Sequence, residues 1–184
     1  MGGKEEKHKK QKYENLYMDL ATRIAEMSYA KRLHVGSVIV KNSNIISFGW
    51  NGMPTGWDNE CEDKEYMSSD AGGWLDPNEI EEQWPMQEQQ LPKENNHWRR
   101  YNLKTKKEVL HAEQNALAKL AKSTESGNGA TMFVTHAPCL DCAKLIFQSG
   151  INSVLYRNSY KSDDGINFLA KAGVLVEKLN KSEF

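Results

Sequence analysis

The sequence has few cysteines, no long apolar run and no excess of positive charge, and each shortage excludes a class of protein. Its three cysteines, Cys61, Cys139 and Cys142, are an odd set that does not indicate a disulfide framework, so a reducing compartment, the cytoplasm, is the simplest setting. No stretch is apolar for long enough to span a bilayer, and we expect no membrane association. The formal net charge of -1 argues against a nucleic-acid partner, because proteins that bind phosphates of nucleic acid usually carry a basic excess.

The length of 184 residues is that of one ordinary domain with a core of its own. Residues 1–12 are polar and lysine-rich and lack the apolar segment of a secretory signal, so we expect a disordered tail there and the domain over residues 13–184. Apolar residues recur at helical spacing over 13–29, and two strands of a hairpin are predicted over 35–40 and 45–50.

Helical and strand patterns alternate in the C-terminal half. Helices are predicted over 111–122, 139–149 and 163–172, and strands over 131–135, 154–156 and 174–176. Such alternation is typical of an α/β sandwich with parallel strand pairing.

The segment from residue 51 to about residue 107 shows no clear period. Between Trp57 and Trp98 there are twelve Asp or Glu residues against two Lys, and four of the five tryptophans lie in that stretch. A solvated loop would explain the charge but not four large aromatic side chains. We therefore expect a partly ordered acidic insertion over about 57–100, whose tryptophans pack on the domain or on a neighbouring subunit.

Two segments hold the residue types of a metal centre, His111-Ala112-Glu113 and Pro138-Cys139-Leu140-Asp141-Cys142, and each opens a predicted helix. Cys139 and Cys142, at i and i+3, place their sulfurs on one helix face, and a helix N-terminus favours thiolates. Two thiolates and the neutral imidazole of His111 balance the charge of a zinc ion and leave its fourth position open for water. Such a water loses a proton near neutral pH.

Glu113 follows His111 by two residues, so it points to a different side of the helix start and could take the proton of that water without binding the metal. Other interpretations stay open. A lone Cys-x-x-Cys also occurs in redox dithiols and in halves of structural zinc sites. A closed structural site would need a fourth ligand, for which Cys61, His97 and His136 are candidates, although none has ligand-like spacing to the cysteine pair.

The order His-x-Glu followed by Pro-Cys-x-x-Cys is the known signature of zinc-dependent nucleobase deaminases. With these motifs the sequence resembles the cytidine and deoxycytidylate deaminase superfamily, and within it most of all the dCMP deaminases, over residues 13–56 and 103–178. The likeness is carried by the segments Val35–Val40, Trp50–Gly56, Thr105-Lys106, His111–Ala116, Thr135–Ala143 and Ser159-Tyr160.

The resemblance implies a three-layer α/β/α sandwich of the cytidine-deaminase type, with a mixed five-stranded sheet flanked by helices. It implies one zinc per chain, held by His111, Cys139 and Cys142. Glu113 would be the catalytic proton carrier in the hydrolysis of dCMP to dUMP and ammonia, a step that feeds thymidylate synthesis.

Four further residues are implied to bind the substrate: Asn51 at the sugar, Arg32 at the phosphate, Tyr160 in the pocket wall, and Ala112. From the residues alone, Asn51 could equally be a turn residue before glycine, Arg32 a surface charge and Tyr160 an aromatic after a strand.

Many members of the family are hexamers that dCTP activates and dTTP inhibits, with a magnesium ion, so the resemblance implies a homo-oligomer and effectors of this kind. Lys161 stands where some relatives have an arginine, a departure that bears on this regulation. Some relatives also hold a second, structural zinc. Here Ala30 occupies the position of its first cysteine and Cys61 stands alone, so we expect one zinc only.

Two other functions share part of the pattern. A deaminase of free nucleosides or of tRNA adenosine uses the same zinc motifs, but the segment Asn51–Gly56 and Ser159-Tyr160 favour the nucleotide enzyme, and a tRNA enzyme should be more basic. A non-catalytic, zinc-stabilised binding module would use the acidic insertion as its interaction surface. It would have no use for Glu113 beside an open metal position.

Overall fold

The computed structural model describes residues 2–66, 74–75, 98–99 and 101–180. The chain forms two compact units, and each is described by itself. The first, here the core unit, comprises Met1–Ser28, His34–Gly52 and Leu110–Phe184. The second, here the insertion unit, comprises Tyr29–Leu33 and Met53–Val109.

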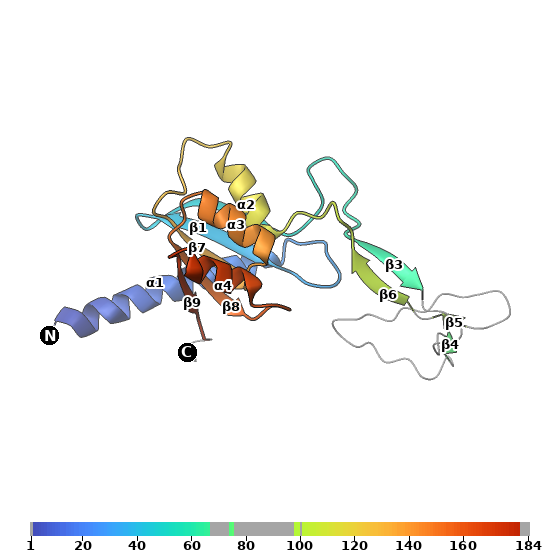
Figure 1. Cartoon of the computed structure of the whole chain (residues 1–184), viewed down its shortest axis with the longest axis horizontal. Coiled ribbons are helices and arrows are strands. Elements are labelled where there is room, and N and C mark those ends of the chain that lie inside the picture. Colours follow the sequence, from blue (N-terminus) through green and yellow to red (C-terminus); the bar gives the residue numbers. More distant parts are fainter. Residues whose placement is uncertain (1, 67–73, 76–97, 100, 181–184) are drawn as a thin grey trace. The chain divides into compact units, whose positions relative to one another are not determined.

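A mixed five-stranded sheet forms the centre of the core unit (Figure 1). Its strands lie in the order β2-β1-β7-β8-β9, where β1 is antiparallel to both β2 and β7, and β7, β8 and β9 are parallel. Asn42 and Ser43 turn the chain between β1 and β2 with positive φ angles, a backbone that suits tight hairpins. The predicted hairpin and the predicted parallel half are therefore confirmed. The strands are β1 (Gly36–Lys41), β2 (Asn44–Trp50), β7 (Thr131–His136), β8 (Ser153–Asn158) and β9 (Leu175–Lys178).

Helices cover both faces of this sheet because its strands bury alternate side chains on opposite sides. Helix α1 (Gly2–Ala25) packs Tyr17, Met18 and Ala21 on one face, against Val38, Val40, Phe133 and Leu155. The other face carries α2 (Ala112–Leu120), α3 (Leu140–Gln148) and α4 (Asp164–Lys171). The buried residues between these helices and the sheet include Ile39, Ala116, Met132, Val134, Ala143, Ile146, Val154 and Leu169. This is the expected three-layer α/β/α sandwich.

Helix α1 differs from its prediction at both ends. It begins at Gly2, so residues 2–12, which were expected to belong to a disordered tail, are helical in the structure. Residues 5–13 are exposed, and the lysines, glutamates and glutamine there are good helix formers that extend the packed helix without a breaker. The helix ends at Ala25, not at residue 29, because the backbone closes into a tighter turn, with the N–H of Ser28 donating to the Ala25 carbonyl at 3.0 Å.

The insertion unit contains two strand pairs that hydrophobic periodicity did not predict. Strand β3 (Glu62–Tyr66) pairs antiparallel with β6 (Tyr101–Thr105), and the short β4 (Trp74–Leu75) pairs with β5 (Trp98–Arg99). Strand β3 is charged on both faces, so no alternation of apolar and polar residues marks it. A small buried cluster of Ala30, Cys61 and Val109, with Met53 against it, lies in the same unit.

Among the four tryptophans of the predicted insertion, the structure describes the exposure of Trp57, which is 58%. Their packing on the domain or on a neighbouring subunit stays a prediction. The side chains of Trp74, Trp84 and Trp98 lie outside the described part of the structure. None of the helices in the described ranges combines the length and apolarity that crossing a membrane requires.

Candidate functional site

His111 lies immediately before α2, in extended backbone with φ of -70° and ψ of 157°. Its N–H donates to Oε1 of Gln114 at 2.9 Å, which is half of a capping box. The side chain of Asn115, one residue further, donates through Nδ2 to the Trp50 carbonyl at 3.0 Å. These two amides fix the backbone of His111 at the start of its helix.

Helix α2 lies close against the hairpin because Gly49 has no side chain. A Cβ at Gly49 would lie 2.4 Å from the carbonyl oxygen of Ala112 and 2.5 Å from the nitrogen of Ala116. Two hydroxyls complete the attachment: Ser37 donates to the Ala112 carbonyl at 2.9 Å, and Ser47 to the Ala116 carbonyl at 2.6 Å. The first turn of α2 is thereby held to strands β1 and β2.

The cysteine pair sits where α3 begins. Cys139 precedes the helix in extended backbone with φ of -70° and ψ of 168°, and Cys142 lies in its first turn. Asn158, at the end of β8, braces the chain that leads to Cys139. Its Nδ2 donates to the Thr135 carbonyl at 2.9 Å, and its own carbonyl accepts the Ala137 N–H at 2.8 Å.

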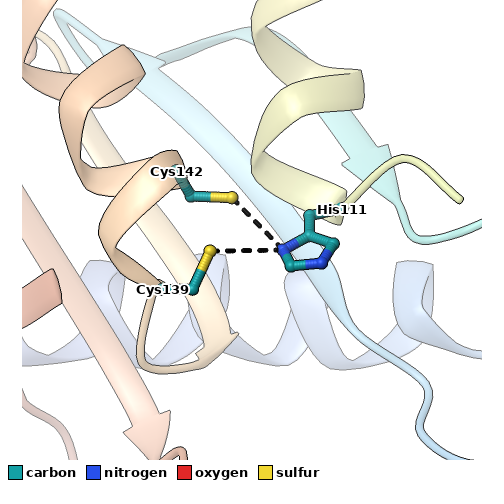
Figure 2. Close-up of side chains that lie close together, drawn as sticks. All are labelled: His111, Cys139 and Cys142. Carbon is teal, nitrogen blue, oxygen red and sulfur yellow. Dashed lines mark hydrogen bonds between the residues drawn. The ribbon is translucent and has the colours of Figure 1, made fainter. Parts of the chain in front are cut away.

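The three predicted ligands meet in one place (Figure 2). Nδ1 of His111 is 3.5 Å from Sγ of Cys139 and 3.4 Å from Sγ of Cys142, and all three ligand atoms lie within 4.8 Å of one another. Zinc bonds of ordinary length at tetrahedral angles would place a nitrogen about 3.6 Å from a sulfur. The donor set and its spacing therefore fit a tetrahedral zinc ion, with Nδ1 as the imidazole ligand.

Within the described residues, this group is the cluster that could hold a metal, and it has three members, not four. Of the fourth-ligand candidates, His136 stays outside the group, with Nδ1 3.2 Å from Oγ1 of Thr135. Cys61 is buried in the small cluster of the insertion unit, and His97 lies outside the described residues.

The ionisable side chains of the cluster share protons through hydrogen bonds, which shifts the pKa of each. The hydrogen bond from Cys142 lowers the pKa of Cys139 to about 4. The same hydrogen bond, together with burial, raises the pKa of Cys142, and hydrogen bonding to Cys139 raises the pKa of His111. A divalent cation between them would replace the shared protons, because it binds thiolates and neutral imidazole.

Glu113 is beside this cluster and almost fully buried, at 4% exposed. Burial raises the pKa of its carboxyl group, against the lowering effects of its backbone hydrogen bond and of the charge on His111. The Cys142 thiol donates a hydrogen bond to the carboxylate, which places Glu113 at the ligands without making it one of them. A buried carboxyl group with a raised pKa can both take and return a proton near neutral pH.

Asn51 and Ala112 both belong to the core unit, which also contains the metal cluster. The Asn51 side chain is 9% exposed and its Oδ1 accepts the Val35 N–H at 2.8 Å, while its carbonyl accepts the Ser28 hydroxyl at 2.8 Å. Its side-chain oxygen therefore stabilises the backbone at Val35. The contact of Asn51 with a sugar stays a prediction. Ala112 is fully buried. In the chain it lies between the predicted ligand His111 and the predicted proton carrier Glu113.

Tyr160 and Arg32 belong to different units. Tyr160 is partly buried against the core of the core unit. Arg32 lies in the insertion unit, where Nη1 donates to Oγ1 of Thr105 at 3.1 Å and its N–H to Oε1 of Glu62 at 3.2 Å. The substrate roles predicted for both residues stay predictions.

Sequence reasoning missed the residues that position the ligands. Gln114 carried a signal, since a glutamine three residues after a helix N-cap is the second half of a capping box. Ser37, Gly49 and Asn158 carried none, because their partners are 75, 63 and 23 residues away for the contacts named above.

Comparison with known proteins gives the same picture. The family model described as the cytidine and deoxycytidylate deaminase zinc-binding region matches residues 11–158. The chain belongs to this family. Its zinc-binding description agrees with the His111, Cys139 and Cys142 cluster, which lies inside the matched range.

Individual family members resemble most of the chain. The deoxycytidylate deaminase of Enterobacteria phage T4 is 34% identical over 175 residues, which are 89% of this chain and 88% of the relative. That of Saccharomyces cerevisiae is 31% identical over 172 residues, 93% of this chain and 46% of the relative. A crystal structure of the dCMP deaminase of cyanophage S-TIM5 in complex with dCMP and dUMP is 39% identical, with a TM-score of 0.65 over 89% of this chain and 94% of that one.

Proposed function

We propose that this deaminase-family chain hydrolyses dCMP to dUMP and ammonia. The cyanophage relative is described in complex with both nucleotides, which differ only by an amino group against an oxygen at C4 of the base. The phage T4 relative, matched over nearly its whole length, is named a deoxycytidylate deaminase. The observation that carries the proposal is the cluster of His111, Cys139 and Cys142 with buried Glu113 beside it.

One zinc ion per chain would be held by Nδ1 of His111 and the two thiolates. When bound, it would supply an acidified water for attack on the base. The two thiolate charges would cancel the charge of the metal, so the pocket would not need further acidic ligands. Only three protein ligands come together in the described residues, which suits a site that must leave a position for water.

Glu113 would move both protons of the reaction. Its carboxylate would accept a proton from the attacking water and deliver it to N3 of cytosine as the new C4–O bond forms. It would then take the second proton from the new C4 hydroxyl group and pass it to the amino group, so that the C4–N bond breaks, ammonia leaves and the C4 carbonyl of dUMP forms. Burial supports this assignment, since it raises the pKa of Glu113 toward the range in which a carboxyl group can both donate and accept.

Asn51, Ala112, Arg32 and Tyr160 would bind the nucleotide, with Arg32 at the phosphate. The support is their place in family-like segments, and Tyr160 already lies against the core of the unit that contains the metal cluster. An arginine gives charge-assisted hydrogen bonds to a phosphate dianion, and these are among the stronger polar contacts in proteins.

The test is a deamination assay on zinc-loaded protein, in which the loss of cytosine absorbance is the measured quantity. We expect dCMP to be consumed much faster than deoxycytidine or cytidine, and dUMP and ammonia to appear in equal amounts. Zinc-loaded protein that leaves dCMP intact would refute the proposal. Faster use of a nucleoside would instead reassign the substrate within the same family.

We also propose a homo-oligomer, of hexameric form, that dCTP with magnesium activates and dTTP inhibits. The proposal extends the family resemblance. Lys161 is the position at which the effector site would differ from that of the relatives that have an arginine there. Light scattering of the purified protein gives the number of subunits, and initial rates with each nucleotide test the effectors. Rates that neither nucleotide changes would remove regulation from the proposal.

Cytoplasmic action is the last part of the proposal. All three cysteines, Cys61, Cys139 and Cys142, are free thiols in the structure, and two of them are metal-ligand candidates that a reducing compartment keeps available. Fractionation of cells that produce the protein would test this placement.

A further inference from the structure

The first turn of α4 lies directly against the peptide that carries the metal ligand Cys139. Gly165, the second residue of this helix, is buried there. A Cβ built on Gly165 would lie 1.9 Å from the Pro138 carbonyl oxygen and 2.9 Å from both the carbonyl carbon and the carbonyl oxygen of Cys139. All three are backbone atoms, so no flexible side chain could move aside.

Space, not backbone conformation, is what requires a glycine here. Among the glycines that the structure describes, those with positive φ are Gly56, Gly129, Gly150 and Gly173, and Gly165 is not one of them. Its backbone is that of an ordinary helix, in which glycine is unfavourable relative to alanine by roughly 1 kcal/mol. The close approach to the Pro138–Cys139 peptide is the feature of the structure that accounts for its presence.

That peptide determines where both thiols point. The Cys139 carbonyl accepts the Ala143 N–H at 2.9 Å, the bond with which α3 opens, and Cys142 lies within the turn so formed. A shift of the peptide would therefore move Sγ of Cys139 and Sγ of Cys142 together, relative to Nδ1 of His111. Zinc tolerates little of this, since its bond lengths hold within about 0.2 Å of their usual values.

Helix α4 is itself firmly anchored, so it can serve as a stop for the peptide. Leu169 is fully buried in the core shared with α2 and α3. The Phe168 ring packs edge-on against Phe147 of α3, with ring centroids 6.2 Å apart.

We propose that Gly165 is a positioning residue of the metal centre: its missing side chain lets α4 support the Pro138–Cys139 peptide at the distance that aims both thiolates at His111. The role rests on the proposed zinc site, and it assigns to α4, a helix without any metal ligand, a part in metal binding.

The experiment compares wild-type protein with Gly165→Ala, loaded with zinc and, separately, with cobalt. The absorption bands of cobalt report its coordination geometry and its thiolate ligands, and they do not depend on turnover. We expect Gly165→Ala to bind zinc about 10–100-fold more weakly, the range found when a partner that orients a ligand is lost. Its cobalt spectrum should lose the intensity of a tetrahedral two-thiolate site.

Gly36→Ala is the matched control. A Cβ at Gly36 would lie 2.1 Å from the Ala21 carbonyl oxygen, an equally severe clash with backbone, but between β1 and α1 on the opposite face of the sheet. It should lower the melting temperature and leave the cobalt spectrum of the folded protein unchanged. An unaltered zinc affinity and cobalt spectrum in Gly165→Ala would overturn the proposal, as would equal spectral changes in both variants.

Two other results, an unfolded variant and a wild-type protein that binds no metal, also test the proposal. If Gly165→Ala does not fold, Phe168→Ala loosens α4 without a clash and should speed the transfer of zinc to a chelator, and an unchanged transfer rate overturns the proposal. If wild-type protein binds neither metal, the proposed zinc site fails together with the role of Gly165. Normal wild-type binding with a normal Gly165→Ala refutes the role of Gly165 alone.

Discussion

Glu113, the proposed proton carrier, is the residue on which the proposed chemistry depends most directly. Replacing it by glutamine keeps the shape of the side chain but removes its ability to accept a proton. We predict that Glu113→Gln retains one zinc per chain and loses about 10²–10⁴-fold or more in turnover of dCMP, because general acid–base groups contribute at least on this scale. Steady-state rates and metal analysis on the same sample check this. Glu125→Gln, a change of the same chemistry at an exposed position, should have full activity.

The same substitution should make the protein more stable, with a defined pH dependence. Burial raises the pKa of Glu113 in the folded state, so the folded protein holds this proton more tightly than the unfolded chain does. Stability contributed by the proton is present at low pH and is lost as pH rises through the raised pKa.

Glu113→Gln has no such loss. Its melting temperature should therefore exceed that of the wild type at pH 8 and approach it near pH 5. Thermal melts of both proteins in the presence of a chelator across this range measure the difference, and a difference that grows toward acid would contradict the assignment.

Arg32 tests the choice of substrate. We predict that Arg32→Ala raises the Michaelis constant for dCMP by about ten- to a hundredfold, the worth of a hydrogen bond to a charged group, and leaves the use of deoxycytidine nearly unchanged. In the proposed mechanism zinc and Glu113 would act on the base, so they could not supply a preference for the phosphate. Lys31→Ala, which removes an exposed charge next to Arg32, is the control. Equal damage to both substrates would show that Arg32 supports the fold only.

At this scale the sequence predicted which three side chains form the metal cluster, because each belongs to a short motif whose spacing reflects the geometry of one helix turn, and the role of Glu113 as proton carrier stays a prediction. His111, Cys139 and Cys142 do meet as predicted. The residues that aim them, such as Gly165 and Ser37, belong to no motif. Their partners become neighbours only after the sheet has formed, so no local pattern indicates them.

At the scale of elements, the two ligand segments share one design, in which an extended residue precedes a helix and carries a ligand. On α2, the capping interaction of Gln114 with the His111 N–H holds the imidazole in place. We predict that Gln114→Ala weakens zinc binding about 10–100-fold, while Gln114→Glu, which keeps an acceptor at that position, loses much less. Competition with a chromogenic chelator measures both affinities, and equal losses would exclude a capping role.

Regular elements were predicted where apolar residues repeat, and they were missed where they do not. The strands and helices of the core unit have one buried face, so their periods appear in the sequence. Strand β3 consists of Glu62-Asp63-Lys64-Glu65-Tyr66 and follows no such alternation. Residues 5–13 of α1 are exposed as well, and the helix continues there through residue propensity, which hydrophobic periodicity does not report.

For the whole molecule, the metal would connect the first turns of two helices, α2 and α3, that otherwise meet only through their packing in the core. We predict that removing zinc lowers the melting temperature, and that saturation with zinc at a hundred times its dissociation constant adds about 2.7 kcal/mol to the free energy of unfolding. Calorimetry with and without a chelator measures this. A melting temperature that is the same with and without zinc would show that the cluster does not bind zinc in the folded state.

Strand β7 lies between the two ligand segments in the chain, since His111 precedes it and Cys139 follows it, and it pairs with a neighbouring strand on each side. A metal that ties α2 to α3 would thus close the chain into a ring that contains this strand. Partial opening of the sheet at β7 would then have to wait for the ring to break. Amide protons of β7 in the loaded protein should exchange with solvent only when the whole core unit unfolds, whereas those of the edge strand β2, outside the ring, remain able to exchange through smaller fluctuations.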